Sequence, residues 1–248
     1  MEDRRRGRTD GKVSRHWSFI LASAPGIAVL CGLGAWQLQR LAWKEALIAE
    51  IASRAAVPPI TLAAALAADD AADDIDFVKV AASGTYLAAE TKFMIQTFDS
   101  GPGWQVVTPL RSVDGIVVLI DRGVVPDAMR GSVPAADGPV ELTGILRRHG
   151  SGRGPFTPDN DDAGNNWYWW DVPAMLAMSD IPADLKVAPF VVQLLPKVGD
   201  TAFPRPQPPD ANLRNNHLQY AMTWFGLALV LAAVATLYVR GQMKKTGA

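Results

Sequence analysis

The chain has 248 residues, of which 49% are hydrophobic, and a formal net charge of -1. This length predicts one or two domains with enough apolar side chains for a sizeable core. The single cysteine, Cys31, excludes an internal disulfide, a copper site of paired thiolates and a Cys-x-x-Cys redox site within one chain. Because Cys31 lies in an apolar run, we expect a small buried apolar side chain there.

Two runs without a formal charge are long enough to cross a membrane. They are Trp17–Leu38 and Leu218–Val239, each of 22 residues. At a rise of about 1.5 Å per residue, each run covers roughly 33 Å, enough for the hydrocarbon core of a bilayer. A cleaved signal peptide is the alternative for the first run. That run is longer than a typical signal core, however, and it continues into AWQLQRLAWKEALIAEI without a small-residue cleavage site.

Basic residues gather at both ends of the chain, and acidic residues lie between them. Residues 1–16 hold six basic and three acidic side chains, and residues 240–248 hold three basic and none acidic. Residues 40–216 hold 15 basic and 22 acidic side chains. Lys and Arg accumulate on the cytoplasmic side of membrane spans. We therefore predict a two-pass protein of the bacterial inner (plasma) membrane, with both termini cytoplasmic and the middle of the chain periplasmic.

Between the two spans the sequence changes from helical to β character. Apolar spacing continues the first helix beyond the span to Pro58-Pro59, and TLAAALAADD (residues 61–70) predicts a short surface or linker helix. Asp114-Gly115 predicts a tight hairpin. Without alternating long helices, the segment from Asp76 favours an antiparallel, barrel-like sheet. Runs rich in Val, Ile, Thr and aromatic residues predict its strands: FVKVAASGTYL, TKFMIQTFD, GWQVVTPLRS, GIVVLIDRGVVP, PVELTGILRR, WYWWDV and FVVQLLPK.

The predicted fold class is therefore a membrane protein of the α+β type, in which two transmembrane helices flank an antiparallel β-rich, barrel-like extramembrane domain. The lipid bilayer is an expected partner. The predicted parts are a basic cytoplasmic tail at 1–16, a first transmembrane helix at 17–39, a periplasmic β-rich domain at 40–214 with its sheet in 76–200, a second transmembrane helix at 215–239 and a basic cytoplasmic tail at 240–248.

Few residues of the domain suggest catalysis. His149, its one histidine, lies in RRHGSGRG, where we expect a solvated loop residue, and no nucleophile motif accompanies it. PDNDDAGNN (residues 158–166) has calcium-type side chains but lacks the ligand spacing and the final glutamate of an EF-hand. The sequence also lacks the patterns of phosphate loops and of nucleic-acid-binding surfaces. We therefore expect no enzyme and no nucleic-acid partner.

His217 stands where a polar stretch, NNHLQY, meets the second apolar run. On a helix, His217, Tyr220 and Trp224 occur at i, i+3 and i+7, and therefore on one face. Tryptophan, tyrosine and a solvated histidine are ordinary at a membrane interface. The alternative is metal binding, because neutral imidazole is a usual axial ligand of haem iron and an apolar aromatic face suits a macrocycle. Spacing alone leaves both interpretations open.

Five motifs together resemble the Surfeit locus protein 1 family. They are, in chain order, GAWQLQRLAWKEALI, GPGWQVVTPL, VVLIDRGVVP, NNWYWWDV and NNHLQYAMTWFGLA, and they are spread over most of the chain. The last motif is the most specific, and the glycine-containing ones are weak alone. One departure is Asp121 in Asp121-Arg122-Gly123, where many relatives have asparagine before the arginine. This departure puts no expected site residue in doubt.

The resemblance implies a cytochrome c oxidase assembly factor that binds haem a transiently and assists its insertion into the catalytic subunit of the oxidase. It implies that His217 ligates the haem iron, and helix geometry suggests that Tyr220 and Trp224 line the ring. The expected partners are that catalytic subunit and haem a synthase. The alternative function is a cofactor-free scaffold that stabilises an oxidase assembly intermediate through its periplasmic domain.

Overall fold

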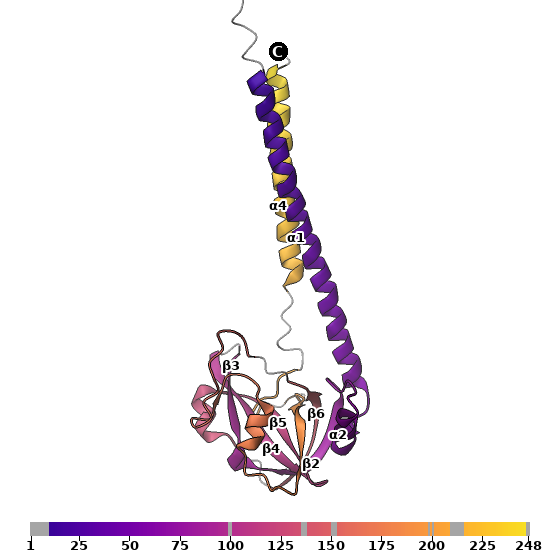
Figure 1. Cartoon of the computed structure of the whole chain (residues 1–248), viewed down its shortest axis with the longest axis vertical. Helices are drawn as coiled ribbons and strands as arrows, with labels where there is room; N and C mark the ends of the chain where they lie inside the picture. The colour runs from indigo at the N-terminus through magenta and orange to yellow at the C-terminus, as the bar shows by residue number, and fades with distance from the viewer. Residues whose placement is uncertain are drawn as a thin grey trace, which may run out of the picture. The chain divides into compact units, whose positions relative to one another are not determined.

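The computed structural model describes residues 10–98, 101–134, 138–149, 153–197, 199, 201–208 and 216–246. The chain divides into two compact units, one formed by residues 1–48 with 213–248 and the other by residues 49–212. Two long helices make up the first unit, and a β-sheet with short helices makes up most of the second (Figure 1).

The first unit contains the helices α1 (Asp10–Ala56), which continues into the second unit, and α4 (His217–Thr246). They run side by side (Figure 1), and they are antiparallel because Gly26 lies against Leu231 while Gly34 lies against Phe225. Among the described residues, α4 is the one helix long and apolar enough to cross a membrane, over His217–Gly241. The span expected at 17–39 falls within α1, where side chains up to residue 22 lie outside the description. That span stays a prediction.

The second unit holds the sheet and the short helices. The strands are β1 (Ile60–Thr61), β2 (Lys79–Tyr86), β3 (Lys92–Phe98), β4 (Gly101–Ser112), β5 (Ile116–Pro126), β6 (Pro139–Arg147), β7 (Asn166–Trp167) and β8 (Lys186–Leu194). The helices are α2 (Leu62–Asp70) and α3 (Val172–Ala177), together with two short 3-10 turns, η1 (Ala88–Glu90) and η2 (Asp127–Ser132).

The sheet closes on itself. Its strands pair in the order β1-β2-β6-β8-β5-β4-β3-β7, and an additional pairing of β2 with β4 completes a ring of five strands. Gly84 of β2 lies at the closure, paired with Val140 of β6 on one side and with Ser112 of β4 on the other. A Cβ atom at residue 84 would overlap the carbonyl group of Arg111, so this close approach of two backbones requires glycine.

The ring is not purely antiparallel, and the expectation of an antiparallel sheet is wrong in this respect. β4 and β6 pair antiparallel with their neighbours in the ring, but β5 and β8 are parallel. The short β1 and β7 also pair in parallel, with β2 and β3. A parallel pair needs a long crossover connection. Here the chain between β5 and β8 supplies it, with β6, β7 and α3 along the way.

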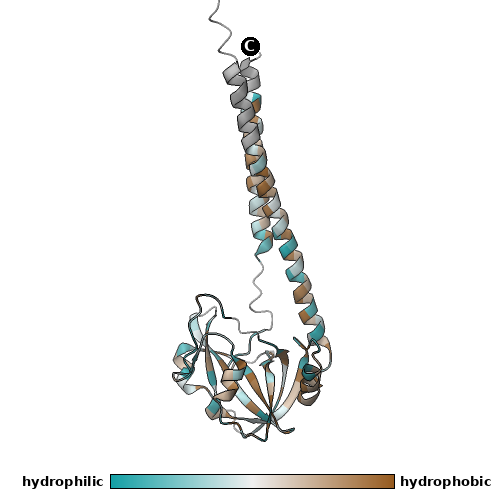
Figure 2. Cartoon of the chain, in the orientation of Figure 1, coloured by the Kyte–Doolittle hydropathy of each residue, from teal (hydrophilic) through white to brown (hydrophobic). Residues whose placement is uncertain are grey.

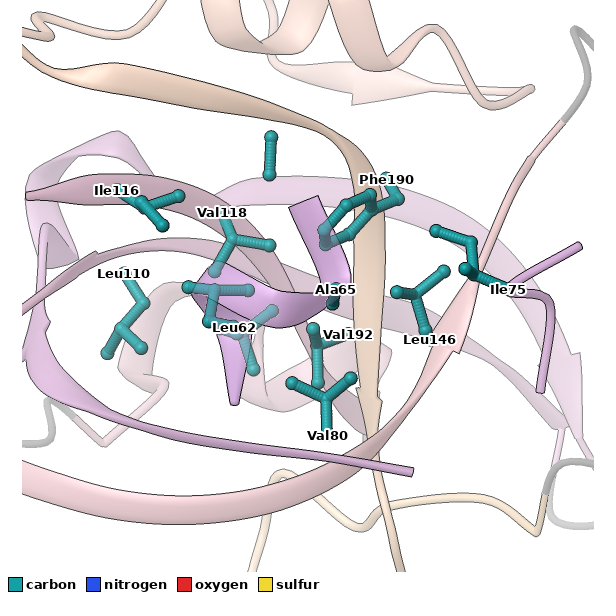
Figure 3. Close-up of a cluster of buried hydrophobic side chains, with 12 residues drawn as sticks. Leu62, Ala65, Ile75, Val80, Leu110, Ile116, Val118, Leu146, Phe190 and Val192 are labelled. Carbon is teal, nitrogen blue, oxygen red and sulfur yellow. The ribbon is translucent and has the colours of Figure 1, made fainter. Parts of the chain in front are cut away.

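β5 lies between two hydrophobic clusters. Leu62 and Ala65 of α2 enter the first cluster, where they meet side chains from β2, β4, β6 and β8 (Figure 3). Trp167 of β7 and three residues of α3 belong to the second. Burial on both faces explains the unbroken apolar run Ile116–Ile120 of β5, in a part of the sheet that is coloured brown in Figure 2. Its side chains alternate between the clusters: Ile116, Val118 and Ile120 enter the first, and Val117 and Leu119 enter the second.

Two helices of the second unit test the expectations for this region. α2 forms where a helix is predicted, and the Thr61 side chain caps it by accepting a hydrogen bond from the N–H of Ala64. α2 is a surface helix, as predicted, with four exposed residues, but its buried Leu62 and Ala65 also contribute to the core, so it is more than a linker. The region WYWWDV is a strand only at its start, because the Asp171 side chain caps the N-terminus of α3.

The hairpin predicted at Asp114-Gly115 joins β4 to β5, with Gly115 at a φ of 73°. Further along the hairpin, Gly123 pairs with Val106 and Asp121 pairs with Val107, so Arg122 has no partner on β4. Gly123 has a φ of 104°, which favours glycine. Such a bulge bends a strand and re-aims one side chain out of the alternating pattern.

Candidate functional site

His217 is the first residue of α4, and its ring contacts α1. The Nδ1 atom of His217 lies 2.7 Å from the Oε1 atom of Gln37. An amide oxygen can only accept a hydrogen bond, so the neutral imidazole carries its proton on Nδ1 and donates it to Gln37. The lone pair is then on Nε2, which is the atom free to bind a metal.

Small residues bring α1 and α4 close enough for this hydrogen bond. Gly34 lies about one turn before Gln37, and a Cβ atom there would be 2.7 Å from the ring of Phe225. Ala221, one turn after His217, is 1% exposed. Glycine and alanine at such positions allow two helix backbones to approach. The packing therefore sets the register that places Gln37 opposite His217.

The two aromatic residues predicted beside His217 have different surroundings. Trp224 is half-buried, as His217 is, whereas Tyr220 is 54% exposed. Ala221 and Ala228, which are buried, lie on the same side of α4 as His217 and Trp224. Tyr220 therefore lies at the open edge of this face. The structure brings His217 together with Gln37, a residue that does not belong to the predicted set.

The chemistry available at this site is that of one imidazole. Among the described residues, no group of three or more His, Cys, Asp or Glu side chains is placed to hold a metal ion. Cys31, expected to be buried, is exposed on α1. A macrocycle such as haem brings four nitrogen ligands of its own and needs only an axial ligand from the protein. The residues at the start of α4 fit that requirement.

His149 is not the solvated loop residue that was expected. Its ring stacks on Trp170 with a centroid distance of 4.0 Å and an interplanar angle of 7°. Burial, together with the nearby charge of Arg147, lowers the pKa of His149 to about 4. The imidazole is therefore neutral at physiological pH and packs as an aromatic ring.

The acidic stretch PDNDDAGNN forms a tight turn. The carboxylate of Asp161 accepts hydrogen bonds from the N–H of Gly164 and from the side-chain amide of Asn166, which hold the pKa of Asp161 below its ordinary value. The next residue in the motif NNWYWWDV is the buried Trp167, whose indole N–H donates to Asn165. Asn165 in turn donates to the carbonyl oxygen of Thr91, at the start of β3. These side chains organise the turn and attach it to β3.

Asp121 of the VVLIDRGVVP motif is a buried carboxylate. It accepts hydrogen bonds from the Gln105 side chain at 2.6 Å and from the N–H of Gly123 at 2.9 Å. Burial raises the pKa of Asp121 to about 6, against the opposing effect of these two bonds and of Arg147. The two hydrogen bonds show that the carboxylate oxygens are engaged by the protein itself.

Two residues of interest were missed by sequence reasoning, Gln37 and Arg122. Gln37 gave a signal, because it is a polar residue inside an otherwise uncharged run and belongs to the motif GAWQLQR. Arg122 also belongs to a motif, but an arginine in a strand-like run has no sequence signature that separates a surface position from a buried one. Arg122 is 9% exposed.

Comparison with known proteins covers nearly the whole chain. The SURF1 family matches residues 26–229. A SURF1-like protein of Monosiga brevicollis is 32% identical over 236 residues, 88% of this chain and 85% of that protein. Surfeit locus protein 1 of Mus musculus is 31% identical over 261 residues, 93% of this chain and 76% of that protein. A SURF1-like protein of Rickettsia felis is 28% identical over 220 residues, 86% of this chain and 92% of that protein. The chain belongs to the SURF1 family.

Proposed function

We propose that this protein is a cytochrome c oxidase assembly factor that binds haem a transiently and assists its insertion into the catalytic subunit of the oxidase. Membership of the SURF1 family supports the role in oxidase assembly. The observation that carries the haem part is the hydrogen bond from His217 Nδ1 to Gln37 Oε1, which leaves Nε2 available as a ligand.

In this proposal each residue near the start of α4 has a separate task. Haem a supplies an iron that takes an axial imidazole ligand. His217 binds this iron through Nε2, and Gln37 holds the imidazole in the tautomer and orientation that the bond requires. Tyr220 and Trp224 offer aromatic surface to the ring. A single ligand on a half-buried side chain suits a cargo that is bound and then released.

The same proposal includes the location of the protein. α4 is apolar over His217–Gly241 and only 6% of its most apolar part is buried within the protein, which supports a position in lipid. The basic ends of the chain support a two-pass topology in the bacterial inner membrane with both termini in the cytoplasm. The β domain then lies in the periplasm, where it meets the catalytic subunit and, during loading, haem a synthase.

The test is the visible spectrum of the full-length protein purified from cells that make haem a. The wild type is expected to carry haem a, and His217→Ala to lose at least tenfold in bound haem, equivalent to the removal of about 1.4 kcal/mol of binding free energy. Gln37→Ala is expected to keep the axial-ligand band but to bind haem 10- to 100-fold more weakly, the usual effect of removing a group that orients a metal-binding histidine.

The matched control for Gln37→Ala is Gln39→Ala, because Gln39 is the same residue type on the same helix and is exposed. Gln39→Ala should bind haem as the wild type does. An unchanged spectrum and haem content in His217→Ala would remove the ligand role. A wild type that carries no haem but still co-purifies with the catalytic subunit would establish the cofactor-free scaffold instead.

A further inference from the structure

A pocket of about 240 Å³ in the β domain contains a buried cation. Its apolar walls come from β6, from the end of β8 and from the proline-rich segment at residues 203–206. They include Val140, Leu142, Leu194, Pro204 and Pro206. Arg122 of β5 and Tyr86 of β2 also line it. Three of these apolar residues pack against the first hydrophobic cluster, so the pocket lies at one end of that core.

Arg122 is 9% exposed, and the described residues satisfy only part of its hydrogen-bonding capacity. Among the described residues its guanidinium donates one hydrogen bond, to the carbonyl oxygen of Pro134 at 2.9 Å, and it lies 5.1 Å from the centre of the Tyr86 ring. Among the described residues, no carboxylate is within ion-pair distance of Arg122. A guanidinium has five N–H donors, and a buried charge is normally paired. Donors of Arg122 are therefore available to a ligand.

The backbone is built to hold Arg122 in this position. The bulge between β4 and β5 removes Arg122 from the ladder, and Gly123 behind it allows the segment around Arg205 to approach. A Cβ atom at residue 123 would overlap the backbone of Arg205. Val124 and Arg205 exchange two backbone hydrogen bonds, both of 2.9 Å. The proline wall of the pocket is thereby attached to the strand that carries the cation.

We propose that this pocket binds an aliphatic carboxylate, with the carboxylate on Arg122 and the hydrocarbon chain against the proline, valine and leucine side chains. Arginine presents a planar fork of donors that matches a carboxylate and holds it through two parallel hydrogen bonds. The apolar walls favour a ligand with a hydrocarbon chain over inorganic anions, which would remain better hydrated in water.

Other groups of the pocket agree with this ligand. Burial raises the pKa of Tyr86, so its hydroxyl stays protonated and can donate to an oxygen anion. Lys197 and Glu141 line the pocket and are exposed, so with Arg122 the cations outnumber the acid. The volume is below the roughly 300–1,000 Å³ of pockets that enclose drug-sized ligands. The pocket therefore suits a short acid or the carboxylate arm of a larger molecule.

The experiment uses the full-length protein in detergent and observes the fluorine NMR line of a hexanoate that ends in a trifluoromethyl group. The amide of the same acid is the neutral control, and protein-free micelles are the blank. We expect the wild type to bind the acid at least tenfold more tightly than the amide, because charge-assisted hydrogen bonds to arginine are lost with the amide. In Arg122→Gln the ratio of the affinities for acid and amide should fall to about one.

Three further variants keep the result interpretable. Arg122→Lys preserves the charge without the fork, and is expected to retain a reduced preference for the acid even if Arg122→Gln fails to fold. Lys197→Gln removes an exposed cation from the same pocket and should change acid binding less than threefold. Asp137 lies outside the described residues, and Asp137→Asn should leave acid binding unchanged. If Asp137→Asn bound the acid tenfold more tightly, the carboxylate of Asp137 would be the partner of Arg122, which would overturn the proposal.

Competition identifies the source of the carboxylate. An iron-free porphyrin that displaces the probe, while its dimethyl ester does not, would assign the site to porphyrin propionates. Displacement by dodecanoate would assign it to fatty acids, and failure of both competitors would assign it to acids as short as the probe. Equal binding of acid and amide by the wild type would also overturn it. Because no probe contains iron, these outcomes are independent of the proposed ligand role of His217.

Discussion

The helix pair and the β domain cover their apolar side chains in different ways. In α4, only 6% of the most apolar stretch is buried within the protein. In β5, every residue from Ile116 to Val125 is buried by the rest of the domain. The domain therefore supplies its own apolar environment, whereas α4 needs one from outside. In the proposed membrane location a lipid bilayer would provide it, and there the hydrophobic effect would no longer drive helices together.

This difference predicts how each region responds to mutation. The β domain depends on close backbone contacts and on burial, so a change that moves its backbone affects the entire core. The helix pair depends on a few small residues and on the hydrogen bond between Gln37 and His217. Changes there should alter the geometry of the site with a small effect on stability.

Gly84→Ala should cause the largest loss of stability, because its Cβ atom would overlap the backbone of Arg111 where the ring closes. No side-chain rotation relieves such a contact, so we expect a loss of roughly 3–5 kcal/mol in the unfolding free energy of the domain. Denaturant unfolding followed by tryptophan fluorescence measures this loss. Gly131→Ala is the control, because a Cβ atom at Gly131 meets no atom within 4 Å. Equal stability of the two variants would contradict the close approach at Gly84.

Asp121→Asn should change the pH dependence of the unfolding free energy. Burial raises the pKa of Asp121 from its ordinary 3.8 to about 6. The protonated side chain therefore stabilises the fold fully at a pH below 3.8, and this stabilisation is lost as the pH rises from about 4 to 6. The loss is about 2–3 kcal/mol. Asparagine does not titrate, so Asp121→Asn should abolish this decrease. A decrease that persists in Asp121→Asn would assign it to another group.

His149→Phe should show a trend of the opposite sign. Burial lowers the pKa of His149 from 6.5 to about 4, so stability from this residue is complete above pH 6.5 and is lost as the pH falls towards 4. Phenylalanine retains the stacking on Trp170 without titrating. At pH 4 the unfolding free energy of His149→Phe should exceed that of the wild type by about 1–2 kcal/mol, after allowance for the partial exposure of His149. No gain at pH 4 would mean that the imidazole is solvated.

Gly34→Ala should have the smallest effect on stability, roughly 1 kcal/mol or less, because the exposed ring of Phe225 can move aside. The helix register should nevertheless shift. Electron–electron distances between spin labels at Val29 and Leu229, both exposed, measure this shift after Cys31→Ser removes the native thiol. Gly32→Ala is the matched control, because a Cβ atom at residue 32 meets no atom within 4 Å. A distance distribution unchanged by Gly34→Ala would contradict close packing at this glycine.

Much of the fold follows from local patterns. The strands of the ring, the hairpin at Asp114-Gly115 and the end of α1 before Pro58-Pro59 are close to prediction, because alternation, turn chemistry and proline act over a few residues. The strand expected at WYWWDV was wrong beyond Trp167, since the aromatic content outweighed the capping signal of Asp171. α2 was predicted as a surface helix, but its buried side was missed, because its alanine-rich sequence has no polar face to reveal which side is buried.

Features that depend on neighbouring residues could be predicted without a structure: a membrane-length apolar helix with His217 at its start, a β-rich domain and basic ends. Features that depend on distant residues became visible only in the folded chain. Gln37 and His217 are 180 residues apart and meet only because glycines let α1 and α4 approach. Arg122 acquires its pocket only when the ring closes and the proline segment pairs with β5. Hydropathy and turn propensity are local properties, whereas the partner of a buried polar group depends on the folded chain.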